Sequence, residues 1–85
     1  METKVAIIGI IVENMASVPE LNKILHEHNT YIIGRMGLPY RAKSLHVISI
    51  VLDASLEVIN KLAETIGHLN GVSIKTAYAG CNSEE

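Results

Sequence analysis

Two stretches of this chain, residues 5–12 and 45–52, are apolar at almost every position. Both are rich in β-branched residues and too short for a typical helix, so they predict strands over residues 4–13 and 45–52. Only His46 and Ser49 interrupt the second run. A strand that is apolar on both of its alternating sets is typical of a position in the middle of a sheet, with both faces covered.

Two other stretches repeat apolar residues at helical spacing. The first follows Ser17-Val-Pro-Glu20, whose S-x-x-E spacing predicts a capping box, and Asn29 is its predicted stop. The second begins after Asp53 or Ser55, either of which can cap a helix, and Asn70-Gly71 ends it. The predicted apolar stripes are Val18, Leu21, Ile24, Leu25 and His28 in the first helix and Ile59, Leu62, Ala63 and Ile66 in the second.

The remaining two strand patterns are weaker. Residues 31–38 are interrupted by Gly34 and Gly37, and Pro39 predicts their end, which is typical of an edge strand or a bulge. A turn is expected over residues 39–44. Residues 72–78 alternate apolar and polar side chains, with Lys75 on the polar set, and predict a second edge strand.

The order of elements is therefore βαββαβ, which predicts a ferredoxin-like α+β fold. Right-handed crossovers make the first and third strands the central pair of an antiparallel four-stranded sheet, with both helices on one face. We expect a single domain over residues 1–79 and a flexible tail over residues 80–85.

The two central strands supply apolar side chains to both faces of the sheet, although the helices cover only one. Depending on register, the uncovered set is either the even-numbered or the odd-numbered one. Six or seven exposed aliphatic side chains forgo on the order of 10 kcal/mol of burial, which rivals the stability of a small domain. We therefore expect a homo-oligomer, a dimer or tetramer, that assembles through the sheet. The two sets are Ala6, Ile8, Ile10, Val12, Ile48, Ile50 and Leu52, or Val5, Ile7, Ile11, Leu45, Val47 and Val51.

Composition narrows the classes of function. The 85 residues include 7 basic and 9 acidic side chains, a net charge of −2, so no direct contact with nucleic acid is expected. The single cysteine, Cys81, cannot form an internal disulfide, which favours a reducing cytoplasmic location. The longest apolar run, eight residues, is far shorter than the roughly 20 that span a bilayer, and no membrane contact is expected.

The segment from Gly34 to Arg41 has the composition of a binding site. Its glycines permit close backbone approach, and two arginines can grip a carboxylate or phosphate. A bulged edge strand followed by an ordinary proline turn explains the same residues equally well. The candidate ligand-binding residues are Arg35, Gly37, Pro39, Tyr40 and Arg41.

Catalytic and metal chemistry have little support in the sequence. No catalytic set is predicted, since Cys81 has no evident histidine partner. His26 and His28 diverge at a helix end, which leaves His46 as the candidate metal ligand, provided that it meets its symmetry copy in an oligomer. A hydrogen-bonded histidine at that position is the more ordinary interpretation. The sequence does not indicate a cofactor.

The opening V-A-I-I-G-I-I-V-E, the R-M-G-L-P-Y-R segment and the ending L-N-G-V-S-I-K-T together resemble the family of iron-only hydrogenase system regulators. That resemblance implies an ACT-like domain, similar in fold to the C-terminal nickel-sensing domain of NikR-type repressors. It implies a regulatory module that assembles through its sheet. NikR-type domains hold nickel with several histidines and a cysteine, whereas here His46 stands alone, and no ribbon-helix-helix segment precedes the first strand.

We therefore predict a cytoplasmic, non-catalytic regulatory domain that forms a homo-oligomer and binds a small anionic or amino-acid ligand at subunit interfaces. A nickel- or zinc-sensing domain centred on His46 is the alternative. A third class, an acylphosphatase-like enzyme with the same order of elements, is disfavoured because the loop from Glu13 to Val18 lacks the arginine of those enzymes.

Overall fold

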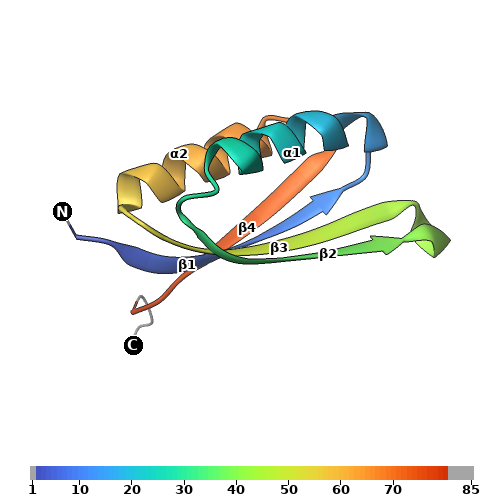
Figure 1. Cartoon of the computed structure of the whole chain (residues 1–85). Coiled ribbons are helices and arrows are strands. Elements are labelled where there is room, and N and C mark those ends of the chain that lie inside the picture. Colours follow the sequence, from blue (N-terminus) through green and yellow to red (C-terminus); the bar gives the residue numbers. More distant parts are fainter. Residues whose placement is uncertain (1, 81–85) are drawn as a thin grey trace.

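The computed structural model describes residues 2–80 of the chain, and the predicted βαββαβ order is confirmed. The four strands form one antiparallel sheet in the order β2-β3-β1-β4, with the predicted central pair in the middle. Both helices lie on the same face of the sheet (Figure 1), so the fold is the predicted ferredoxin-like one. The elements are β1 (Lys4–Val12), η1 (Met15–Ser17), α1 (Val18–Glu27), β2 (Ile32–Tyr40), η2 (Arg41–Lys43), β3 (Leu45–Ala54), α2 (Leu56–Gly67) and β4 (Val72–Tyr78).

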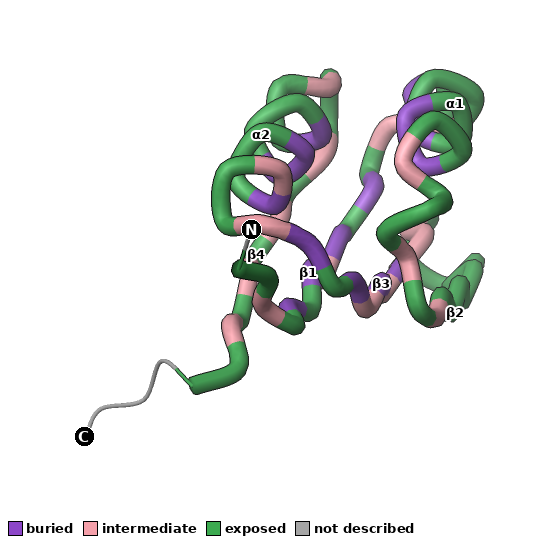
Figure 2. The backbone as a smooth tube through the Cα atoms, turned by 60° about the vertical axis from the view of Figure 1, so that its left-hand side comes forward, coloured by how far each residue is buried: buried purple, intermediate pink, exposed green. Residues whose placement is uncertain are grey.

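The register of the central strands decides which apolar set faces the helices. Ile8 pairs with Ile50 and Ile10 with Ile48, and all four side chains are buried. The even-numbered set therefore forms the core together with the stripes of the two helices (Figure 2), and the odd-numbered set lies on the other face. The fully buried large side chains are Ile8, Ile10, Val12, Leu21, Leu25, Ile48, Ile50, Leu52, Ile59, Leu62 and Ile66.

Strand β2 is the edge strand that its glycines predict, with a bulge between Ile32 and Gly34. The predicted end at Leu38 is wrong, because the strand continues through Pro39, opposite His46, to Tyr40. An edge strand tolerates proline because one side of its backbone faces solvent, where a missing N–H costs no ladder hydrogen bond.

The capping box predicted at Ser17 is not formed. Ser17 itself has helical backbone angles, and its hydroxyl donates instead to the carbonyl oxygen of Asn70, at 2.6 Å. Ser17 is buried, so this hydrogen bond satisfies a polar group that has lost contact with water. The residue joins two connections that are 53 positions apart in the sequence.

The turn before β4 packs against the same region. Gly71 has φ +72°, and its carbonyl accepts a 2.7 Å hydrogen bond from the backbone N–H of Glu13. A Cβ at this position would lie 2.6 Å from the Cβ of Asn14 and 2.9 Å from its backbone nitrogen. Both the positive φ and the close approach therefore require glycine.

Helix α2 begins as predicted at one of the two alternatives. Ser55 is the cap, since its hydroxyl accepts a 3.3 Å hydrogen bond from the N–H of Val58, whereas Asp53 is still part of β3. Within residues 2–80, neither α1 nor α2 is long and apolar enough to cross a membrane. The domain boundary expected at residue 79 remains a prediction, and most of the predicted tail lies outside the described residues.

Candidate functional site

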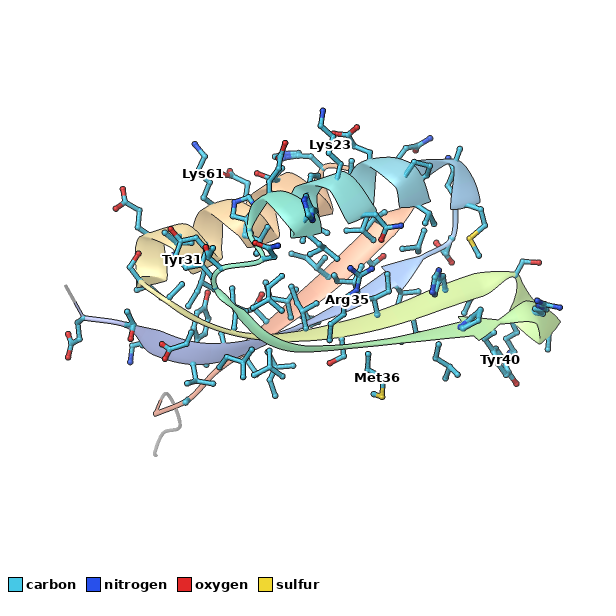
Figure 3. All side chains as sticks on the ribbon, in the orientation of Figure 1. Lys23, Tyr31, Arg35, Met36, Tyr40 and Lys61 are labelled. Atoms are coloured by element: carbon cyan, nitrogen blue, oxygen red, sulfur yellow. The ribbon has the colours of Figure 1, made fainter. Side chains whose placement is uncertain are left out.

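The face of the sheet that lies opposite the helices is not covered by any of residues 2–80. We call it the open face. Met36 is 68% exposed and Leu38 58%, both on β2, and Ile7 and Ile11 on β1 are also exposed. Met36 points away from the helices (Figure 3). By strand alternation the open face consists of Val5, Ile7, Gly9 and Ile11 of β1, Ile33, Gly34, Met36, Leu38 and Tyr40 of β2, Leu45, Val47, Ser49, Val51 and Asp53 of β3, and Ser73, Lys75 and Ala77 of β4, with Ile33 beside Gly34 at the bulge.

The open face changes character from one edge of the sheet to the other. Its β2, β3 and β1 positions are largely aliphatic or aromatic, whereas β4 contributes only Ser73, Lys75 and Ala77. The apolar area is therefore centred on β3, with β4 as a polar margin. Isolated exposed aliphatic side chains are ordinary on a protein surface, but a contiguous patch over three strands marks an interaction site.

A hollow of about 360 Å³ lies in the open face beside Gly9. The hollow exists because Gly9 has no side chain. It is lined by Ile11 of β1, Val47 of β3, and Ser73 and Lys75 of β4. Among the residues that the structure describes, a Cβ on Gly9 would meet only the Lys75 carbonyl oxygen, at 3.9 Å, so none of residues 2–80 fills this space.

The residues predicted to bind a ligand are divided between the two faces. Arg35 points toward the helices and Tyr40 away from them (Figure 3). Alternation puts Gly37 and Pro39 on the same side as Arg35. Arg41 lies beyond the strand, in η2.

Arg35 has one defined partner. Its Nη2 donates a 2.7 Å hydrogen bond to the side-chain oxygen of Asn22 on α1. At about 3.3 Å of rise per residue, some 16 Å of strand separates Arg35 from Tyr40, which directly precedes Arg41. The structure thus does not bring the two predicted arginines together within one chain.

His46 lies on the helix-facing side of β3, beside Gly37, where an added Cβ would be 3.5 Å from Nε2 of the imidazole. An assembly through the open face therefore does not bring two copies of His46 into contact. Over residues 2–80, no group of three or more His, Cys, Asp or Glu side chains is placed to hold a metal ion. Cys81 lies outside the described residues.

Met36, Leu38 and Gly9 are features of the surface that the sequence analysis missed. A signal for the first two was available, because Met36, Leu38 and Tyr40 alternate with Arg35, Gly37 and Pro39, and alternate positions of a strand lie on opposite faces. The period of two in this segment therefore places Met36, Leu38 and Tyr40 on one side of the strand and Arg35 on the other, and not in a single site.

The fold and its open face define a ferredoxin-like domain with an uncovered apolar sheet surface. Residues 4–76 match the TM1266-like family, described as "Iron-only hydrogenase system regulator, putative", and the chain belongs to that family. The structure of uncharacterized protein TM1266 from Thermotoga maritima is similar, with a TM-score of 0.88 and 28% sequence identity over 92% of this chain and 99% of that one. No curated protein matches. The resemblance noted in the sequence is confirmed.

Proposed function

We propose that this chain is a non-catalytic regulatory domain of an iron-only hydrogenase system, and that it acts as a homo-oligomer assembled through the open face. The description of its family supports the regulatory role. The exposed aliphatic side chains of β1 and β2 support the assembly. A regulator of this kind transmits a signal when a ligand or partner favours one assembled arrangement over another.

The area of the open face carries this proposal. Seven large side chains that are roughly 40–70% exposed leave on the order of 700 Å² uncovered, close to the roughly 800 Å² per partner of a standard stable interface. At about 25 cal/mol per Å², covering that area is worth on the order of 15 kcal/mol per copy before the costs of association. The seven side chains are Val5, Ile7, Ile11, Ile33, Met36, Leu38 and Tyr40.

The molar mass in solution tests the assembly. We expect sedimentation of the wild-type chain at micromolar concentration to give a dimer or a larger oligomer. Ile7→Lys places a charge in the open face and is expected to give a monomer that is still folded by circular dichroism, because Ile7 is not part of the core. Glu64→Lys, on the exposed side of α2, is the matched control and leaves the mass unchanged. A wild-type monomer at this concentration contradicts the proposal.

Ligand binding is the second part of the proposal, with Arg35, on the helix-facing side of β2, and Arg41, in η2, as anchors of acidic groups of the ligand. Isothermal titration with inorganic phosphate, amino acids and nucleotides is the test. We expect Arg35→Gln and Arg41→Gln each to weaken binding of the ligand that is found, while Lys23→Gln on α1 does not. Titration with nickel and zinc, repeated with His46→Ala, tests the metal-sensing alternative in the same samples.

The regulatory role requires a test in cells. In a host that makes an iron-only hydrogenase, removal of this chain is expected to change hydrogenase transcript or activity levels. Wild-type chain restores them, and the monomeric Ile7→Lys variant does not. Unchanged hydrogenase levels after removal contradict the regulatory role, whatever the oligomeric state.

A further inference from the structure

The polarity of the open face restricts how a second copy can cover it. The large apolar side chains of the open face come from β2, β3 and β1, and β3 lies between the other two. Homo-oligomers are mostly built on two-fold axes. An axis that runs along β3, between the two facing sheets, places β2 of each copy over β1 of the other. It leaves both copies of β4, with Lys75, at the solvent-exposed margin, where its charge stays in water.

Residues that are paired on neighbouring strands form rows across the sheet. Such an axis brings each row of one copy over the same row of the other. Met36, Ser49 and Gly9 form one row, because Ser49 pairs with both of the others. Gly34, Val51 and Ile7 form the adjacent row on the same face, with Val51 in the middle. A rotation about β3 preserves the position of each row along the strands and exchanges β2 with β1.

The side chains of β1 and β2 in these two rows are complementary in size. Where β1 has Gly9, β2 has Met36, the most exposed of the large apolar side chains. Where β1 has Ile7, β2 has Gly34, and apart from its chain neighbours Ile33 and Arg35 nothing lies within 4 Å of an added Cβ there. The rotation therefore sets a projecting side chain of one copy over a glycine of the other, twice in each copy.

The other simple way to stack the two faces does not give this match. An axis across the strands, through the row of Met36 and Gly9, superposes each residue of that row on itself. Met36 then meets Met36 at a separation of about 10 Å between sheets, while Gly9 meets Gly9 and leaves the hollow unfilled. It also puts β4 over β4, which brings two copies of Lys75 together.

We infer that two copies of this chain pack open face to open face about a two-fold axis along β3, and that Met36 of each copy fills the hollow beside Gly9 of the other. Ile7 of each copy packs over Gly34 in the same way. Ser49 is the residue of the row of Met36 and Gly9 nearest the axis and faces its own copy across it. This inference rests on the assembly proposed above and specifies its geometry.

Exchanging the large and the small side chain between positions 36 and 9 tests the arrangement of the dimer about β3. Gly9→Leu fills the hollow and is expected to weaken the dimer at least about 30-fold, because two contacts become overpacked. Met36→Ala empties the hollow and weakens it by about the same factor. The double variant G9L/M36A restores the fit in both contacts and is expected within about 5-fold of the wild-type Kd.

Two controls accompany the measurement. Ala77→Leu enlarges a side chain on the β4 margin and leaves the dimer Kd unchanged, whereas the axis across the strands predicts a loss. Urea unfolding at concentrations below the dimer Kd measures each variant as a monomer. Positions 9 and 36 are about 10 Å apart across β3 within one chain, so their stability effects are expected to add, and a coupling seen only in Kd arises between copies.

The outcomes separate this geometry from the assembly itself. If the wild-type chain is a monomer at micromolar concentration, both the assembly and its arrangement about β3 are contradicted. An oligomer that Gly9→Leu does not weaken, or that G9L/M36A fails to restore, overturns the arrangement about β3 and leaves the oligomeric regulator intact. Restoration by the double variant, with Ala77→Leu silent, establishes the arrangement.

Discussion

The two faces of the sheet use similar amino acids for different purposes. On β1, Ile8 and Ile10 are fully buried beneath the helices, while Ile7 and Ile11 on the opposite face are close to half exposed. Residues that are neighbours in sequence therefore belong to two surfaces, one that folds the chain and one that is free to bind. Hydrophobicity alone does not separate these roles, since the difference lies in which face the helices cover.

The largest expected difference between the faces is in stability. Ile8→Ala removes methyl groups from a filled core and is expected to lower the free energy of unfolding by about 3–4 kcal/mol. Ile7→Ala, one residue away, lowers it by less than about 1 kcal/mol in the monomer, because its surroundings are already open to water. Urea unfolding at concentrations where the chain is monomeric compares the two.

A result in which the Ile7 and Ile8 variants lose equal stability contradicts the comparison. Ile7→Ala is also expected to weaken the oligomer, because Ile7 lies on the open face, whereas Ile8 does not. Sedimentation of both variants at several concentrations measures this difference.

The glycines give the second largest contrast. Gly71→Ala forces a side chain into a left-handed backbone and against Asn14, so we expect a loss of about 2–3 kcal/mol. Gly9→Ala places a methyl group on the open face in ordinary contact with the Lys75 carbonyl oxygen, at 3.9 Å, and changes monomer stability by no more than about 0.5 kcal/mol. Thermal unfolding of the two variants and the wild-type chain measures the difference, and equal losses would show that the hollow at Gly9 is already filled within one chain.

Ser17 extends the comparison of stability effects to a polar side chain that is buried on the helix side of the sheet. Ser17→Ala leaves the carbonyl oxygen of Asn70 without its buried donor, and we expect a loss of about 1–2 kcal/mol. Ser73→Ala on the exposed margin of the open face is the matched control, with an effect near zero. Equal effects in urea unfolding would mean that the Ser17 hydroxyl is as well solvated as the Ser73 hydroxyl.

The smallest expected effect concerns the Arg35–Asn22 hydrogen bond, which is exposed. A double-mutant cycle with Arg35→Gln and Asn22→Ala is expected to give a coupling of at most about 0.5 kcal/mol in stability, because water competes for both groups. A coupling above about 1.5 kcal/mol would assign this contact a role in holding α1 on the sheet.

Much of the fold followed from local patterns. The helical stripe ending in Ile66 and the strand patterns in residues 5–12 and 45–52 identified both the type of each element and its place in the sheet. The errors occurred where one residue type serves two purposes. Ser17 fits a capping box by spacing, but its hydroxyl is used by a residue 53 positions away, and no local pattern contains that partner.

The candidate site was less accessible from the sequence. Arg35 and Arg41 were predicted to act together because they are close in sequence, whereas the extended strand keeps them apart. Met36 was overlooked since an exposed methionine has no chemical signature by itself. Its significance comes from Gly9, which is distant in the sequence and shares a row with it through Ser49.

By itself the sequence determined the order of elements, the central and edge strands and the excess of apolar side chains, because strand and helix periodicities are local properties. It left two alternating sets of β1 and β3 as equal candidates for the covered face. Only the tertiary structure decided between them, since the choice depends on which side of the sheet the crossover helices pack, and alternation along a strand is the same for either answer. That choice also leaves Ile7, Gly9 and Met36 on the surface where a second copy can reach them.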